Sequence, residues 1–287
     1  MRNSTRTSVR RGFTLVELLV GMVIFAIIGT AFTKLLSVQG RFFDKQGMAN
    51  AARNVSRASL NRVVSDFRMI EATGGVVAAS SQSLTIRVPF AIGVVCGDLA
   101  GVTVLSLLPV DSASYASAGY YGYAWRNFQT GAYSYVENPS TEIAGNAAVC
   151  AAKNLTTVPP GKVVAVTPTV PVLAGLGAPV FLYARIRYEL KASAAVPGML
   201  GLWRTQIMPG GGELPEELVA PFAPTAKWRF FVLGNSEVAQ DAPPAQLSNI
   251  RGLELHLDGI SEYKAPGMVS NESAPFTTAV FFKNRTN

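Results

Sequence analysis

The hydrophobic positions of this 287-residue chain begin as one unbroken run. From Phe13 to Thr33 there are 21 residues, and Glu17 is the only charged one among them. An α-helix rises about 1.5 Å per residue, so a helix of this length just covers a bilayer core of roughly 30 Å. The pattern predicts a transmembrane helix over residues 13–36, with one carboxylate that needs a functional explanation.

After Lys34 the run gives way to an amphipathic pattern, in which apolar or small residues recur at steps of three and four. No proline occurs before Pro89, so one long helix can extend over residues 13–72, with Thr73-Gly74-Gly75 as its stop and Gly40 and Gly47 as possible bends. The predicted buried face consists of Met48, Ala52, Val55, Ser59, Val63, Phe67 and Ile70.

The rest of the chain, residues 73–287, has the pattern of a β-rich globular head. Core-facing and polar residues alternate from Val180 to Leu190, and again around Leu253, Leu255 and Leu257. Segments 137–160 and 207–226 are rich in Pro, Gly and Ala and are predicted to be loops. Further strands are expected at 84–88, 102–107, 162–166, 228–233 and 276–283. The expected fold class is α+β, a long N-terminal helix packed on a β-rich head.

The net charge of +7 belongs mostly to the first twelve residues, which hold four arginines and no acid. Without them, 25 − 4 = 21 basic residues face 18 acidic ones, a balance of +3. Arginines that flank an apolar segment stay cytoplasmic, so we expect residues 1–12 in the cytoplasm and the head across the membrane. A general secretory signal would have a shorter apolar region with a small-residue cleavage site after it, whereas here Gly12 precedes the run.

The two cysteines, Cys96 and Cys150, fit an exported head. In an oxidising compartment such a pair forms a disulfide, which over this loop contributes roughly 4 kcal/mol in the chain-entropy model. Two free buried thiols are the alternative.

Candidate chemistry is sparse, and we expect no catalytic residues, no metal and no cofactor. The single histidine, His256, falls on the polar face of its predicted strand, where a solvated surface role is the simpler interpretation. Gly210-Gly211-Gly212 lacks the lysine and hydroxyl that a phosphate-binding loop requires.

Six of the nine tyrosines fall between Tyr115 and Tyr135, together with Trp125 and Phe128. Segment 115–135 is either an aromatic contact surface or a hairpin whose rings pack on the head. Binding of single-stranded DNA would need interleaved basic residues, and Arg126 is the only one between the cysteines, so no direct nucleic-acid contact is predicted.

The order basic leader, Gly12, Phe13, Glu17 and membrane span resembles the processing site of type IV prepilins and type II secretion pseudopilins. The resemblance implies cleavage between Gly12 and Phe13 by a prepilin peptidase, N-methylation of Phe13, and storage in the inner membrane before assembly into a pilus or pseudopilus. It further implies that Glu17 neutralises the new amine of a neighbouring subunit. Pairing within one chain, across a single helical turn, stays open.

Within that family the chain resembles PilW-type minor pilins and the related J-type pseudopilins, and its length favours the minor pilin. The segments that carry this resemblance are RNVSRASLNRVVSDFR, LGLWRTQ, WRFFVLG and LSNIRGLELHLDGIS. This resemblance implies a low-copy subunit of a tip or priming complex, with other minor pilins and the major pilin as partners. A J-type minor pseudopilin of a type II secretion system is the near alternative. A single-pass membrane enzyme or solute-binding domain is the alternative of another class.

Overall fold

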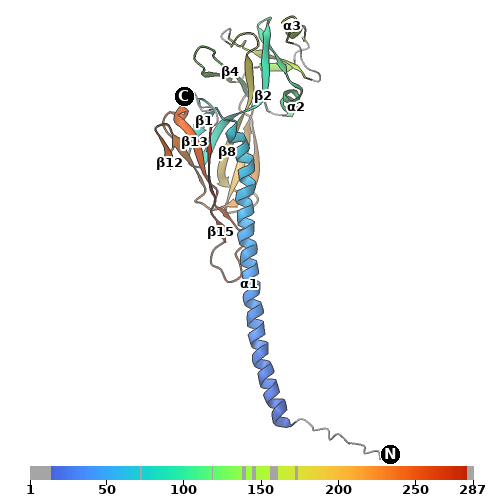
Figure 1. Ribbon diagram of the computed structural model, residues 1–287, viewed down its shortest axis with the longest axis vertical. Helices are drawn as coiled ribbons and strands as arrows, with labels where there is room; N and C mark the ends of the chain where they lie inside the picture. Colours follow the sequence, from blue (N-terminus) through green and yellow to red (C-terminus); the bar gives the residue numbers. More distant parts are fainter. Residues whose placement is uncertain are drawn as a thin grey trace, which may run out of the picture.

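The structure is a computed structural model in which a long helix carries a β-rich head at one end (Figure 1). It describes residues 14–71, 73–117, 119–137, 140–143, 147–155, 161–171 and 174–282. The predicted leader and the Gly12–Phe13 cleavage site lie outside these ranges. The long N-terminal helix and the β-rich head together form the α+β, pilin-like architecture expected from the sequence.

Helix α1 (Leu15–Arg68) is continuous over 54 residues and passes through both Gly40 and Gly47 without a break. Its first half stands clear of the head, and its second half lies along it (Figure 1). The helix ends at Arg68, before the predicted glycine stop, because the chain then turns with Met69 as C-cap.

The second half of α1 packs through the face that the periodicity predicts. Ala52, Ser59, Val63, Phe67 and Ile70 are buried, and Met48 and Val55 are partly buried. Close approach to the head is possible because a glycine faces the helix: a Cβ at Gly259 would collide with the Ala52 carbonyl oxygen. The Gly259 backbone N–H instead donates to Ser56 Oγ at 3.1 Å, and Ser56 Oγ donates to the Leu257 carbonyl at 2.8 Å.

Two antiparallel sheets form the head in the described part of the chain. The larger sheet has the order β15-β14-β10-β9-β8-β2-β3-β7-β6, with β1 beside β2 and the hairpin of β4 and β5 attached to β8. Its strands are β1 Val76–Ala79, β2 Ser83–Leu99, β3 Val102–Leu107, β4 Gly122–Arg126, β5 Tyr133–Glu137, β6 Ser140–Ile143, β7 Val163–Thr167, β8 Pro179–Ala192, β9 Leu200–Ile207, β10 Glu213–Phe222, β14 Gly259–Ile260 and β15 Ser273–Ala274. The smaller sheet has the order β12-β11-β13-β16, with β11 Lys227–Val232, β12 Asn235–Gln240, β13 Ile250–His256 and β16 Thr277–Phe281.

Three short helices complete the described elements of the head: α2 Pro109–Ser117, α3 Ala148–Ala151 and the 3-10 turn η2 Leu247–Asn249. Helix α2 was not predicted, although Pro109 at its first position is a recognised start signal.

The head has two lobes that share the long strands β2 and β8 (Figure 1). The proximal lobe contains α1, the smaller sheet and one end of both long strands; its core includes Phe67, Ile86, Tyr188, Trp228 and Leu255. The distal lobe contains the other end of both strands, with α2, α3 and β3 to β7. Its core includes Val95, Leu105, Tyr123, Val164 and Leu182.

A β-bulge marks the change from one lobe to the other. The register between β2 and β8 shifts between Pro89 and Ala91, and proline is tolerated in a strand at such a bulge. Val88 on one side packs in the proximal core, whereas Ala91 on the other side packs in the distal core. One pair of strands therefore serves two separate cores.

Most predicted strands are confirmed, including the alternation from Val180 to Leu190, whose core-facing residues are all buried in β8. The prediction of a loop over 207–226 is wrong, because β10 occupies half of it. Strand β10 pairs with β9 along its length but with β14 only at Phe222, so it is largely an edge strand, where Pro215 and Pro221 are tolerated. The loop predicted over 137–160 likewise contains β6 and α3.

Candidate assembly surfaces

The start of α1 is capped by two polar side chains, those of Thr14 and Glu17. Thr14 is the N-cap: its backbone N–H donates to Glu17 Oε2 at 3.0 Å, and the Glu17 backbone N–H donates to Thr14 Oγ1 at 3.3 Å. This reciprocal pair is a capping box, which satisfies helix N–H groups that have no intrahelical partner. Within one chain Glu17 thus has a local role that the sequence interpretation did not include.

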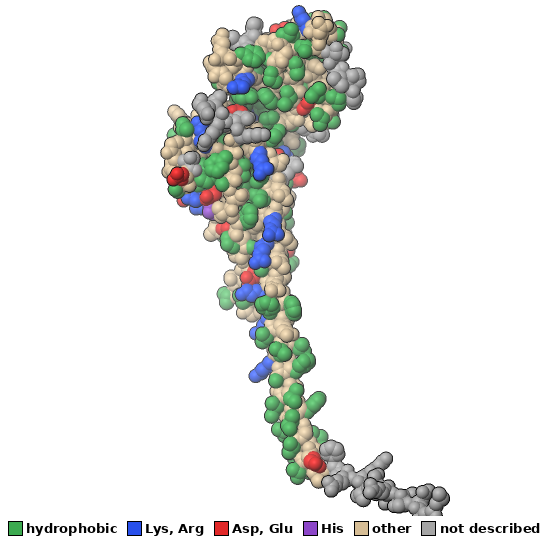
Figure 2. Space-filling model, in the orientation of Figure 1, with side chains coloured by type: hydrophobic (Ala, Val, Ile, Leu, Met, Phe, Trp, Pro, Cys, Tyr) green, Lys and Arg blue, Asp and Glu red, His purple; other side chains and the backbone are tan. Residues whose placement is uncertain are grey.

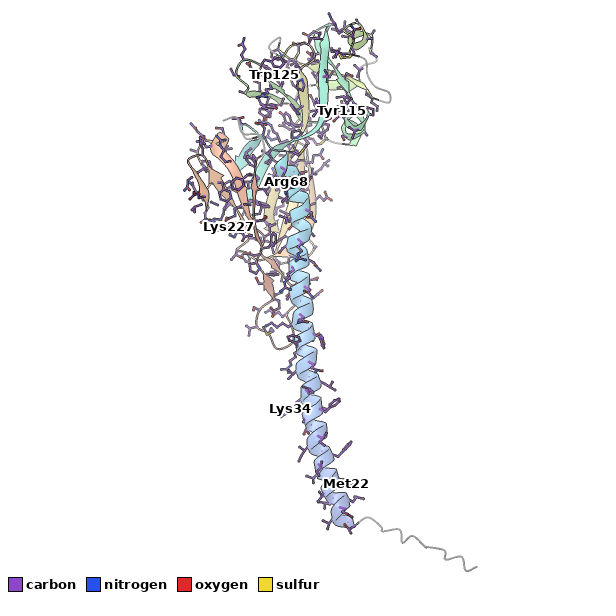
Figure 3. The ribbon with its side chains drawn as sticks, in the orientation of Figure 1. Met22, Lys34, Arg68, Tyr115, Trp125 and Lys227 are labelled. Carbon is purple, nitrogen blue, oxygen red and sulfur yellow. A yellow bond between two sulfur atoms is a disulfide. The ribbon has the colours of Figure 1, made fainter. Side chains whose placement is uncertain are left out.

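The first half of α1 exposes apolar side chains on every side. From Leu15 to Phe43 all residues are exposed, and the most apolar 18-residue window has a mean hydropathy of 2.4 with none of it buried. Figure 2 shows this stretch covered by hydrophobic side chains, and Figure 3 shows Met22 and Lys34 pointing away from the bare helix. Water would not favour such a surface, and by length and composition the helix can cross a membrane.

The end of α1 is fixed to the proximal lobe by a partly buried polar contact beside aromatic contacts. Tyr188 Oη donates to Asp66 Oδ2 at 2.6 Å, and Arg204 Nε lies 3.4 Å from the same oxygen. Burial, followed by the Asp66 charge, raises the pKa of Tyr188 above its ordinary value. The Phe67 ring meets the rings of Tyr188 and Trp228 edge-on at centroid distances of 5.5 and 5.8 Å.

The predicted disulfide is present in the distal lobe. Cys96 on β2 and Cys150 on α3 are bonded, with their Cα atoms 4.7 Å apart, and both are fully buried. The bond ties the short helix α3 to the large sheet.

The aromatic segment 115–135 packs on the head, as the hairpin interpretation predicted. Strands β4 and β5 form the hairpin, Tyr121, Tyr123 and Trp125 are buried, and the Trp125 label lies within the distal lobe in Figure 3. Tyr123 Oη donates to the Pro168 carbonyl at 2.7 Å, and burial, with Asp98 nearby, raises the pKa of Tyr123 to about 12. Phe128 at the hairpin turn is 64% exposed and is the exception.

A pocket of about 340 Å³ opens where the end of α1 meets the distal lobe. Inside it the Arg87 guanidinium lies 4.5 Å from the centroid of the Tyr135 ring and pairs with Glu137. Sequence reasoning missed this pocket because its residues come from six elements far apart in the chain. The lining includes Arg68, Glu71, Phe90, Asp111, Tyr133, Phe181 and Tyr183.

His256 takes part in a surface ion network on the smaller sheet. Its Nε2 lies 2.5 Å from Glu254 Oε1, which also accepts from Arg229 at 2.5 Å. Burial by itself would raise the pKa of Glu254, but these two hydrogen bonds hold it below its ordinary value. Among the described residues, no group of three or more His, Cys, Asp or Glu side chains is placed to hold a metal ion.

The comparisons with known proteins concern the N-terminal segment. Residues 7–33 match the model of the prokaryotic N-terminal methylation motif. The matched segment includes Gly12, Phe13 and Glu17, and it runs into the exposed apolar half of α1. No curated protein and no solved structure matches the chain.

The motif and the architecture together indicate a class of protein. The chain carries a prepilin-type methylation motif at the start of a long helix, and that helix ends in a β-rich head. This combination supports the assignment of the chain to the type IV pilin and pseudopilin class. Such a motif implies processing by a prepilin peptidase and assembly with other pilins, and with the apolar helix it indicates membrane anchoring.

Proposed function

We propose that this protein is a minor pilin of the PilW type, a non-catalytic subunit of a tip or priming complex that supports assembly of a type IV pilus. The observation that carries the proposal is the methylation motif at residues 7–33, which runs into the first half of α1, where the apolar side chains are exposed in the described part of the chain. In a membrane those side chains face lipid, and in a fibre they face the same helices of neighbouring subunits.

Glu17 is the residue on which this function depends. Cleavage after Gly12 would create an α-amino group at Phe13, and a carboxylate one helical turn further is suited to neutralise an amine in an apolar fibre core. The capping box gives Glu17 a second task, because the same carboxylate accepts the Thr14 backbone N–H. We infer that capping orders the helix start in the stored subunit and that Glu17 pairs with a neighbour's amine on assembly.

Three variants separate these two tasks. Glu17→Gln keeps an acceptor for Thr14 but removes the charge; Glu17→Ala removes both; Thr14→Ala removes the reciprocal cap and keeps the charge. If neutralisation drives assembly, both Glu17 variants should be processed yet recovered poorly in sheared fibres, and Thr14→Ala should be recovered nearly as well as wild type. Normal recovery of Glu17→Gln in fibres would reject neutralisation. If only Thr14→Ala were recovered poorly, the role of the Thr14–Glu17 pair in assembly would be helix capping.

The assignment to prepilins itself is tested by the intact mass and N-terminal sequence of the membrane-extracted protein. We expect loss of residues 1–12 and a methyl group on Phe13, and we expect Gly12→Ala to accumulate as full-length precursor. A chain that retains Met1 in a strain with an active prepilin peptidase would contradict the proposal.

The J-type minor pseudopilin remains the second candidate, because the same motif and helix serve a secretion pseudopilus. Deletion of the gene distinguishes the two: loss of surface pili with intact protein secretion supports the minor pilin, and the reverse supports the pseudopilin. A membrane-anchored solute-binding domain would depend on the pocket beside Arg87, and for that reading Tyr135→Ala should abolish function without changing processing or fibre recovery.

A further inference from the structure

The loop between β14 and β15, residues 261–272, is the part of the head that extends furthest toward the bare half of α1 (Figure 1). Its base is held by backbone and side-chain hydrogen bonds: the Ser261 N–H donates to the Glu272 carbonyl at 2.8 Å, and Asn271 Nδ2 donates to the Glu262 carbonyl at 3.2 Å. These hydrogen bonds hold the two ends of the loop together where it leaves the sheet.

Contacts with α1 fix the height of this loop along the helix. Ser56 Oγ lies 3.4 Å from the Ala274 carbonyl, and further toward the N-terminus Lys45 Nζ lies 3.8 Å from Glu272 Oε1. From these contacts the loop continues along α1 toward the N-terminal end of the helix (Figure 1). At this height α1 itself exposes Phe42 and Phe43.

The far part of the loop exposes apolar side chains with no cover from the head. Val269 is 91% exposed, and Tyr263 and Met268 are also exposed. Ala265, by contrast, is buried, so the loop is packed at one point and bare at its apolar end. The exposed apolar side chains of the loop lie near a helix segment whose own apolar side chains are exposed. Such a surface marks a contact with an apolar partner.

The distance along α1 between the loop and the hydrocarbon core is compatible with contact between the loop and lipid. If the hydrocarbon core ends near Leu36, Lys45 stands nine residues, or about 14 Å, above it along the helix, and the headgroup layer occupies roughly the first 5–7 Å. Lys45 thus stands about 7 Å above the headgroups, and the apolar end of the loop meets them if it reaches that far in the direction in which the loop extends (Figure 1).

The charges around the loop indicate how it would meet lipid. Three basic and three acidic residues lie in the loop and in the stretch of α1 from Arg41 to Lys45, and their charges balance. Attraction to anionic headgroups is therefore weak, and insertion of the apolar side chains must supply the interaction. The six residues are Arg41, Lys45, Lys264, Asp44, Glu262 and Glu272.

We propose that the β14–β15 loop inserts Met268 and Val269 into the outer headgroup layer of the membrane while the subunit is stored there. The loop and α1 then form two points of contact that hold the head at a fixed tilt before assembly. This inference rests on the membrane anchoring that is part of the proposed function.

The test uses the full chain reconstituted into phosphatidylcholine vesicles, with and without phosphatidylglycerol. Val269→Cys is labelled with an environment-sensitive fluorophore; its matched control is Val238→Cys on β12, which is also exposed but lies on the other sheet. We expect a blue shift, loss of quenching by iodide and gain of quenching by spin-labelled lipid at position 269 and none of these at 238. The signal should not depend on the anionic lipid, because the charges balance.

The alternatives give different results. A chain that fails to float with vesicles would reject the membrane anchor, and with it the proposed function, before the loop is tested. A chain that floats but shows the same iodide quenching at 269 and 238 would overturn the loop proposal alone. Protection from iodide without quenching by spin-labelled lipid would also overturn it, since another protein copy would then cover the loop.

Discussion

The proximal and distal lobes are built on the same two strands, yet different interactions hold them together. In the proximal lobe, one face of α1 packs across the sheets, and Phe67 lies in the middle of that contact against Tyr188 and Trp228. The distal lobe makes little use of α1, and its short elements are secured by the Cys96–Cys150 disulfide and by buried tyrosines.

This difference follows from how each lobe is assembled along the chain. A long amphipathic helix offers a large continuous face, so a core can form on it without covalent help. An element as short as α3 buries little apolar surface, and a disulfide compensates by restricting the unfolded chain. The lobe that joins the anchor is therefore held by packing, and the lobe furthest from it by cross-linking.

The largest expected effect concerns Phe67→Ala. Removal of a fully buried ring that contacts two other aromatic residues should lower the free energy of unfolding by about 5 kcal/mol, the upper end for such changes. Hydrogen exchange of the detergent-solubilised chain should show loss of protection in β11 and β13, while β4 and β5 keep theirs. Arg57→Ala, on the exposed face of the same helix, is the control, and equal loss in both lobes would contradict two separate cores.

The disulfide gives the reciprocal test. Cys96→Ala combined with Cys150→Ala should destabilise the head by about 4 kcal/mol, with increased exchange confined to β3, β7 and α3. Reduction of the wild-type chain should reproduce the same pattern. If the proximal strands lost protection to the same degree, β2 and β8 would couple the lobes into one unit.

Removal of a single tyrosine hydroxyl group should lower the free energy of unfolding by a smaller amount, and this amount should differ between the lobes. Tyr188→Phe removes a hydrogen bond to the Asp66 carboxylate and should cost about 2 kcal/mol, because bonds to charged groups are the stronger ones. Tyr123→Phe removes a bond to the neutral Pro168 carbonyl and should cost about 1 kcal/mol. Urea unfolding of the two variants side by side checks the order, and a reversed order would show that Arg204 already satisfies Asp66.

How far the sequence could anticipate these features depends on how local each one is. The helix face was predictable because residues three and four apart share a side, as Val63, Phe67 and Ile70 do. The strands with clear alternation, such as Val180–Leu190, were predictable for the same reason. Glu17 and the cysteines stood out because their residue types are unusual in their surroundings.

Features that depend on distant partners could not be predicted in this way. Strand β10 carries two prolines and becomes a strand only because β9 is beside it. Nothing near Gly259 in the sequence indicates that it faces Ala52 and Ser56, and nothing near Pro89 indicates that the core changes there. The division into two lobes is a property of the sheet register, which short-range patterns do not contain.

The smallest expected effect is a loss of stability at alkaline pH, and it should again differ between the two lobes. Burial raises the pKa of Tyr123 to about 12, and burial likewise raises the pKa of Tyr120, Tyr135 and Tyr183, all close to the distal core.

An unfolded tyrosine loses its proton near pH 10, so between that value and the folded pKa the native state binds more protons than the unfolded state. Stability must therefore be complete below about pH 10 and fall as the pH rises further. Near-ultraviolet circular dichroism and tyrosinate absorbance of the full chain should show this loss, and Tyr123→Phe should make it less steep. The same slope in the variant and in wild type would show that Tyr123 does not contribute to it, and that the other buried tyrosines carry the linkage.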